Sequence, residues 1–174
     1  MSARDILGKF NIEYSAPCAS LCDDLSVFDV SAGLCPSLRG DDLLTPTREL
    51  ISKLETLAKA EISTLAEYLS AIDSGLGDFK NAGCVFCDHA LDNGFDYIPD
   101  DGENEKRFAS LLRGDNLCKH DAEHLSSFIL KSLLSLYAKH GFTVQLHIGA
   151  QRCTSTRLRT LAGAAGGYAA AGSC

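Results

Sequence analysis

The sequence predicts an α/β fold in which parallel strands are joined by pairs of helices. Residues 142–148 (FTVQLHI) alternate between apolar and polar side chains, which is typical of a strand. Residues 121–141 instead place apolar side chains at helical spacing and stop at Gly141. Long helical segments of this kind separate the predicted strands, and such crossovers favour parallel pairing with right-handed connections.

The predicted elements follow one another as strand, strand, two helices, strand, two helices and strand. The strands are expected at residues 10–14, 27–37, 84–88 and 142–148, and the helices at residues 45–60, 64–83, 105–114 and 121–141. Thr45 is expected to cap the first helix, with Pro46 at its first position. Thr64 and Glu67 have the spacing of a capping box before the second helix.

Four strands would make half of a closed (β/α)8 barrel, which needs eight strands and about 250 residues. We therefore expect a partial (β/α)8 barrel of the TIM type, with residues 1–174 forming a single region, an internal portion of such a barrel. The Gly- and Ala-rich segment 161–174 shows no periodicity, so it is expected to add no closing element.

Composition excludes several classes of partner. Hydrophobic residues make up 45% of the 174 residues, charged residues 22%, and the formal net charge is -7. A net-acidic chain is not attracted to nucleic acid or to an anionic membrane surface, so neither is expected as a partner. The chain has no apolar run long enough for a signal peptide or a membrane span, which predicts a cytoplasmic protein. Its eight cysteines are therefore expected to be mostly free thiols.

Charged side chains follow three of the predicted strands and are candidates for a functional site. Arg39 follows the second strand, Asp88 ends the third, and His147 and Arg152 lie at the end of the fourth. The carboxyl ends of parallel strands meet at one rim, so these groups are expected to converge there. Arginine forks bind carboxylates, while Asp and His move protons, which suits an anionic, sugar-like substrate.

Each candidate also has a purely structural interpretation. His147 could be a capped structural histidine, Asp88 could cap the segment that follows it, and Arg39 could form a surface ion pair of little energetic weight. Cys84 and Cys87 have Cys-x-x-Cys spacing, but a structural zinc site needs a second such pair, and residues three apart in a strand point to opposite faces. Three histidines near the last helix are expected at the surface: His120, His124 and His140.

Four ordered segments resemble one known family. QLHIGAQR (145–152) is similar to the Q-L-H-I-G-A-x-R signature of uronate isomerase (glucuronate isomerase), a branch of the amidohydrolase superfamily. LCPSLRGDD (34–42) resembles the family's P-S-F-R-P-D segment, and AGCVFCDHALD (82–92) resembles its G-C-R-x-S-D-H-G segment. Residues 154–173 resemble the loop after the histidine-containing strand, which often reads A-G-P-A-G-G-Y.

The resemblance implies a distorted (β/α)8 barrel that isomerises D-glucuronate to D-fructuronate and D-galacturonate to D-tagaturonate, usually with one divalent metal such as zinc. Arg39, Asp88, His147 and Arg152 match the family's active-site positions. The arginines would hold the carboxylate and hydroxyls of a small-molecule uronate. Asp88 and His147 would orient hydroxyls or assist proton transfer between C2 and C1.

The sequence also departs from the family pattern. The family's metal-binding histidines lie in an H-x-H, which occurs nowhere in this chain, and a further metal-binding aspartate lies on the last strand of the barrel. We therefore expect no metal ligand in this chain, no bound cofactor for the chain alone, and no isomerase activity from it in isolation. The alternative hypothesis is a non-catalytic remnant or interaction module that self-associates through exposed sheet edges.

Overall fold

The computed structural model describes residues 3–10, 12–91, 95–152, 154–163 and 168–170. Its main sheet contains β1 (Cys18–Ala19), β2 (Ser37–Arg39), β3 (Phe86–Leu91) and β4 (Thr143–Ile148), in that spatial order. All neighbouring strands in this sheet are parallel. The predicted α/β class is therefore confirmed.

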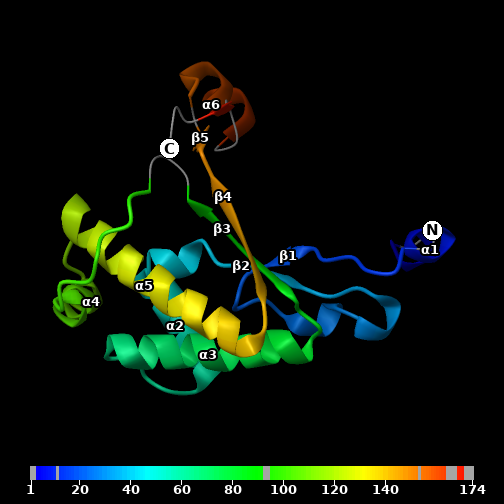
Figure 1. Cartoon of the computed structure of the whole chain (residues 1–174), viewed down its shortest axis with the longest axis horizontal. Helices are drawn as coiled ribbons and strands as arrows, with labels where there is room; N and C mark the ends of the chain where they lie inside the picture. Colours follow the sequence, from blue (N-terminus) through cyan, green and yellow to red (C-terminus); the bar gives the residue numbers. More distant parts are fainter. Residues whose placement is uncertain (1–2, 11, 92–94, 153, 164–167, 171–174) are drawn as a thin grey trace.

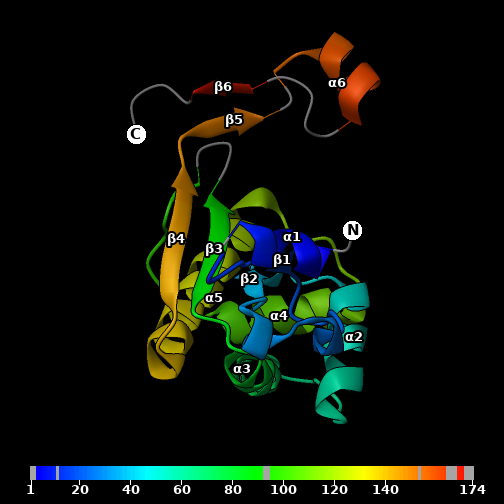
Figure 2. The ribbon, with the colours of Figure 1, turned by 90° about the vertical axis from the view of Figure 1, so that its right-hand side faces the viewer.

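Two pairs of helices form the crossovers. α2 (Arg48–Ala58) and α3 (Leu65–Asn81) connect β2 to β3, and α4 (Asn104–Arg113) and α5 (Lys119–His140) connect β3 to β4. These helices gather on one side of the sheet (Figures 1 and 2). A short α1 (Ala3–Lys9) precedes the sheet and lies away from these helices (Figure 1). No helix among the described residues is long and apolar enough to cross a membrane.

The first two strands are not where the sequence pattern suggested. The described residues of this first segment, Phe10 and 12–14, form no strand, and Phe10 is exposed, whereas β1 begins at Cys18. Residues 27–37 mostly form turns and the short 3-10 helices η1 (Leu25–Val27) and η2 (Val30–Ala32). The side chains of Asp24 and Asp29 accept N–H bonds from Ser26 and Ala32, and such local bonds compete with strand pairing.

The other elements differ from prediction mainly at their ends. β3 begins two residues later than expected and continues to Leu91. Thr47, not Thr45, caps α2, because its hydroxyl accepts the N–H of Leu50 (3.2 Å). The capping box of Thr64 and Glu67 before α3 is present as predicted.

The C-terminal segment contains elements that its sequence did not predict. β5 (Ala150–Arg152) pairs antiparallel with β6 (Tyr168–Ala170), and α6 (Thr156–Ala162) lies between them. The lack of periodicity in residues 161–174 thus did not rule out a short strand, but β6 pairs with β5 and not with a strand of the main sheet. Ser155 caps α6 by accepting the N–H of Leu158, a signal that a Gly- and Ala-rich pattern obscures. β5 and α6 stand apart from α2–α5 (Figure 2).

The hydrophobic core lies between the main sheet and its helices. Leu38 of β2 and Cys87 of β3 are fully buried against the apolar faces of α2, α3 and α5. Those helix faces contribute Ile51, Leu54, Ile72, Leu76, Phe79, Ile129 and Leu133, all fully buried. The apolar face predicted for residues 142–148 is only partly covered: Phe142 is buried, but Ile148 is 61% exposed.

An ion-pair cluster joins α3 to the end of α5 and predicts acid sensitivity. Asp73 accepts bonds from Lys139 Nζ (2.5 Å) and His140 Nε2 (2.7 Å), and the bonds from Lys139 and then His140 lower the pKa of Asp73. A carboxyl group with a lowered folded-state pKa stabilises the protein above its unfolded-state pKa, and this contribution disappears as pH falls through the folded-state value.

We therefore expect Asp73→Asn to lower the free energy of unfolding by about 0.5 kcal/mol at neutral pH, as for a surface ion pair. This difference from the wild type should shrink toward zero as pH falls through the lowered pKa of Asp73, where the wild-type carboxyl group also becomes protonated. Urea unfolding at several pH values measures it, with Asp78→Asn on the exposed face of α3 as the control. A difference that does not change with pH would show that the Asp73 charge is not the cause.

Candidate functional site

Strand register brings Arg39, Asp88 and His147 to one face of the main sheet. Arg39 lies beside Asp88, Asp88 beside Gln145, and Ala90 beside His147. Neighbouring residues in parallel strands point to the same face, and residues two apart in one strand share that face. The three side chains therefore lie opposite the face that Cys87 and Leu38 present to the helices.

Asp88 is the centre of this group. Its Oδ2 forms an ion pair with Arg39 Nη1 at 2.8 Å and lies 3.7 Å from His147 Nε2. The Asp88 side chain is 6% exposed, while that of His147 is 44% exposed. The Oδ1 atom of Asp88 is buried, and no described residue donates a hydrogen bond to it. The site thus contains a carboxylate oxygen with an open position for a donor.

Arg39 has a second carboxylate partner that the sequence did not identify. Its Nε donates to Asp41 Oδ2 at 2.5 Å. Burial alone lowers the pKa of Arg39, but the hydrogen bond that it donates to Asp41 and the charges of Asp41 and Asp88 outweigh burial and raise this pKa. Arg39 therefore stays charged, and the Arg-Gly-Asp spacing of residues 39–41 was the signal available for Asp41.

The main chain of the neighbouring turn is tied to the same residues. Gly40 N donates to the carbonyl of Asp88 (3.0 Å), and Ala90 N donates to Asp41 Oδ1 (2.5 Å). On the helix side, His89 is fully buried, and its Nε2 lies 2.8 Å from the Tyr137 hydroxyl. Burial, the largest effect, lowers the pKa of His89. The His89 ring thus packs as a neutral group behind the turn.

Arg152, the fourth candidate, lies on a different sheet. It is the last residue of β5 and pairs with Tyr168 of β6. The turn between β4 and β5 includes Gly149, whose φ is 83°. Of the four predicted site residues, the main sheet therefore brings together three.

The structural interpretation of Asp88 is wrong, and that of Arg39 is incomplete. Asp88 lies inside β3 and does not cap the following segment. Arg39 forms a partly exposed ion pair with Asp41, and it also pairs with the buried carboxylate of Asp88. Among the histidines expected at the surface, His124 is buried and lies 3.7 Å from Asp101 Oδ2.

The metal expected for the family does not fit the described residues. In the part of the chain that the structure describes, no three His, Cys, Asp or Glu side chains are grouped so that they could hold an ion. Asp88 and His147 are only two potential ligands, and Arg39 already occupies Oδ2 of Asp88. Cys84 precedes β3, so the argument from strand alternation does not apply to it. Both thiols of the Cys-x-x-Cys pair are buried, which raises their pKa, that of Cys87 to about 12.

Six cysteines are free in the described chain, as predicted: Cys18, Cys22, Cys35, Cys84, Cys87 and Cys118. Cys153 and Cys174 lie outside the described residues. The described thiols therefore add no disulfide to the fold.

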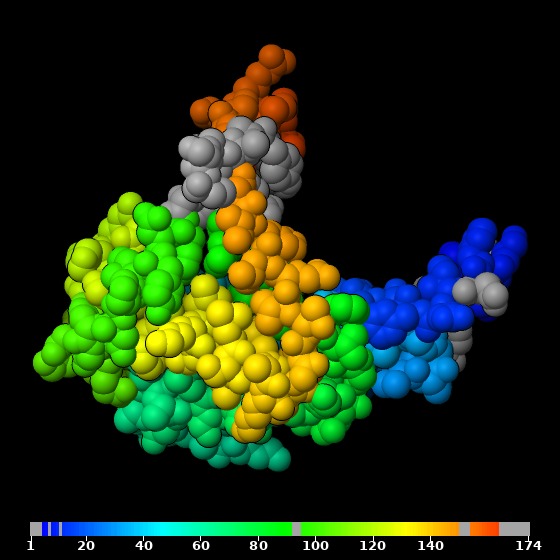
Figure 3. Space-filling view, viewed as in Figure 1, coloured from blue at the N-terminus to red at the C-terminus, as the bar shows by residue number. Residues whose placement is uncertain are grey.

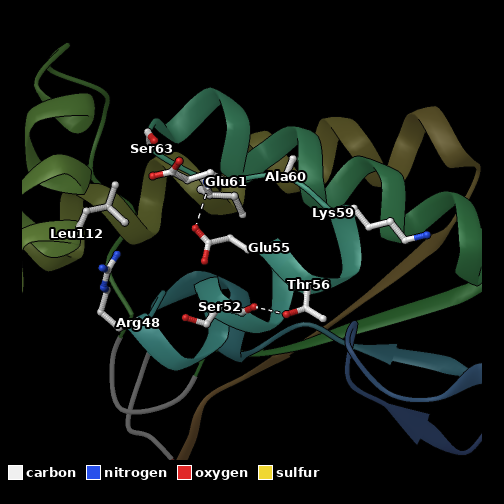
Figure 4. Close-up of a pocket in the computed structure, with 10 residues that line it drawn as sticks. Arg48, Ser52, Glu55, Thr56, Lys59, Ala60, Glu61, Ser63 and Leu112 are labelled. Atoms are coloured by element: carbon white, nitrogen blue, oxygen red, sulfur yellow. Dashed lines mark hydrogen bonds between the residues drawn. The ribbon is translucent and has the colours of Figure 1, made fainter.

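A spacious groove lies elsewhere on the molecule. It has a volume of about 870 Å³ and runs along α2 and the connection to α3 (Figure 4). Glu55 points into this connection, where its Oε1 accepts the N–H of Ile62 at 3.1 Å. A hollow of about 280 Å³ instead borders the candidate site through Asp41 and Ala90. None of the four predicted residues lines the large groove, so groove size does not locate this site.

The main sheet has helices on one face and charged side chains on the other, beside the carboxyl ends of its parallel strands. This arrangement is that of an α/β protein of the barrel type. The model of the glucuronate isomerase family matches residues 2–173. The chain therefore belongs to the glucuronate isomerase family, as the four sequence segments indicated.

Curated relatives agree with this assignment. A uronate isomerase of Caldanaerobacter subterraneus subsp. tengcongensis is 29% identical over 178 residues, which cover 96% of this chain and 38% of the relative. One from Vibrio vulnificus (strain YJ016) is 34% identical over 121 residues, covering 69% of this chain and 26% of the relative. The chain thus spans well under half the length of these relatives.

The solved structures establish the fold. The uronate isomerase of Thermotoga maritima superposes with a TM-score of 0.83 at 22% identity, over 98% of this chain and 40% of that one. The glucuronate isomerase of Caulobacter crescentus gives a TM-score of 0.75 at 21% identity, over 91% of this chain and 35% of that one. The partial barrel is therefore a portion of the uronate isomerase fold.

Proposed function

We propose that this chain carries the uronate-binding residues of an isomerase that converts D-glucuronate to D-fructuronate and D-galacturonate to D-tagaturonate. The observation that carries the proposal is the group of Arg39, Asp88 and His147 on one face of the sheet, with an unpartnered Oδ1 on the buried Asp88. An open-chain uronate has hydroxyls that can donate to this oxygen and a carboxylate that can accept from arginine.

Arg39 has hydrogen-bond donors to spare for the substrate. Asp41 accepts from its Nε, and Asp88 forms an ion pair with its Nη1, which leaves both N–H groups of Nη2 without a partner among the described residues. These groups would hold oxygens of the open-chain sugar, and Arg152 would provide a second guanidinium. Two forks of this kind would fix the sugar chain along the rim.

Asp88 and His147 would assist the proton transfers of the reaction. Aldose–ketose isomerisation moves one proton from C2 to C1 and another between the two oxygens, so that the product is an isomer of the substrate. Asp88 would accept a substrate hydroxyl through Oδ1, and His147, half exposed beside it, would exchange a proton with the sugar. The described residues do not form a site for the family's divalent metal.

Calorimetry with D-glucuronate tests the proposal directly. We expect the wild-type chain to bind it and Arg39→Gln to bind it at least about tenfold more weakly, because a charged hydrogen-bonding partner is lost. Arg113→Gln is the matched control, since Arg113 is exposed and pairs with Asp115 on the surface. Equal affinity of the wild type and Arg39→Gln would contradict the proposal.

An assay of D-glucuronate conversion, with zinc added to the same samples, tests whether the chain catalyses the reaction. We expect no D-fructuronate from the isolated chain. Product that disappears with His147→Ala would instead show that this chain catalyses the reaction without further residues.

A second candidate function, self-association, is favoured by one observation. β4 is the last strand of the main sheet, and Leu146 and Ile148 on it are exposed. Figure 3 shows β4 open at the surface beside α5. Exposed strand edges pair with other chains, so light scattering should detect dimers or larger species. A monomer at all concentrations would exclude this candidate.

A further inference from the structure

Asp41 contacts both Arg39 and the adjacent strand, although it is not one of the four predicted site residues. We propose that Asp41 is a positioning residue that fixes the guanidinium of Arg39 for the substrate. This inference rests on the proposed function, because it concerns how the same site holds a uronate. Asp41 would act on the substrate only through Arg39 and would not contact the reacting atoms.

The two oxygens of Asp41 have different partners. Oδ2 accepts from Arg39 Nε at 2.5 Å, and Oδ1 accepts from the main-chain N–H of Ala90 at 2.5 Å. The second bond anchors the Asp41 carboxylate to the main chain of β3 and involves no other side chain. The position of the β3 main chain therefore fixes Asp41, and Asp41 in turn fixes the side chain of Arg39.

Arg39 is consequently held at two points. The ion pair between Nη1 and Asp88 places the guanidinium near that carboxylate but does not fix the orientation of its plane. The hydrogen bond from Nε to Asp41 restricts this orientation, because the Nε–H lies in the guanidinium plane. The remaining N–H groups are then oriented before the substrate arrives, which reduces the entropy lost on binding.

Asp41 could affect binding through its charge or through the position of Arg39, and these two explanations predict opposite changes in affinity when Asp41 is neutralised. If Asp41 acted only through its charge, Asp41→Asn would remove a negative charge near the site and strengthen binding of an anion by about two- to threefold. If Asp41 positions Arg39, the same change should weaken binding by about tenfold, because the ordering of Arg39 is lost. The sign of the change therefore separates the two explanations.

The experiment measures D-glucuronate affinity by calorimetry in a double-mutant cycle of Asp41→Asn and Arg39→Lys. We expect Asp41→Asn to weaken binding about tenfold in the wild-type background and to have little effect when Arg39 is already Lys, since lysine has no Nε–H. Asp42→Asn, at the exposed neighbouring residue, is the control for net charge. Equal losses in both backgrounds, or stronger binding by Asp41→Asn, would overturn the proposal.

A measurement without ligand separates this inference from the proposed function. In protein labelled with ¹⁵N at arginine, the Nε proton of Arg39 should exchange with water far more slowly than that of the exposed Arg113. Fast exchange at Arg39 in the wild type would overturn the positioning role even if Asp41→Asn failed to fold. Slow exchange with no glucuronate binding by the wild type would support the Asp41 contact and contradict the proposed function.

Discussion

Replacing Arg39 by alanine is expected to lower the free energy of unfolding by about 3 kcal/mol, the lower end of the range for breaking a buried ion pair. The Asp88 side chain is almost fully buried and would lose its ion-pair partner at 2.8 Å. The effect should not reach the upper end of that range, because the Arg39 side chain is itself 34% exposed and water can partly replace it. Chemical unfolding followed by circular dichroism measures this change in the free energy of unfolding.

The double variant Arg39→Ala with Asp88→Asn tests this explanation. It should recover part of the lost stability, because the neutral amide needs no counter-charge. Arg113→Ala, which removes an exposed arginine, should change stability by less than about 0.5 kcal/mol. If the double variant is no more stable than Arg39→Ala, the unpaired charge of Asp88 is not the cause.

Replacing Gly40 by alanine is expected to cost about 2 kcal/mol by overpacking. A β-carbon at this position would lie 2.5 Å from His89 Cε1 and 2.9 Å from the Tyr137 hydroxyl. Both rings are fully buried and hydrogen-bonded to each other, so neither can move aside easily. The turn between Arg39 and Asp41 would have to shift instead, and we expect glucuronate affinity to fall with stability.

Gly77→Ala is the matched control, because the nearest side-chain atom to its β-carbon is His140 Cε1 at 3.9 Å. In the middle of α3, alanine should stabilise by up to about 1 kcal/mol through its higher helix propensity. Thermal unfolding of the two variants should therefore shift in opposite directions. Equal shifts would mean that the close contact at Gly40 has no energetic consequence.

The long elements of the fold could be predicted from the sequence, and the short ones could not. α5 and β4 have enough residues to show a helical or an alternating pattern. β1 and β2 have two and three residues, too few for any alternation. The apolar residues in 10–14 and 27–37 have the spacing of strands. In and beside the second segment, however, the side chains of Asp24 and Asp29 accept main-chain N–H bonds, which favour short 3-10 helices over strand pairing.

The candidate site was partly predictable for a similar reason. Arg39, Asp88 and His147 were found because strand ends meet at one rim, which requires only the order of the elements. Asp41 and His89 were missed because their contacts depend on how the turn after β2 meets β3 and α5, which no periodicity encodes. The burial of His124 likewise depends on its neighbours Asp101 and His120.

The order of strands in the main sheet has a consequence for synthesis of the chain. β1, β2, β3 and β4 lie side by side in the order in which the ribosome makes them. Each crossover can therefore dock on an edge that has already formed, without waiting for a distant segment to be inserted between earlier strands. The core of β2, α2 and α3 can be assembled before α5 emerges, and β4 then needs to find only one neighbour, β3.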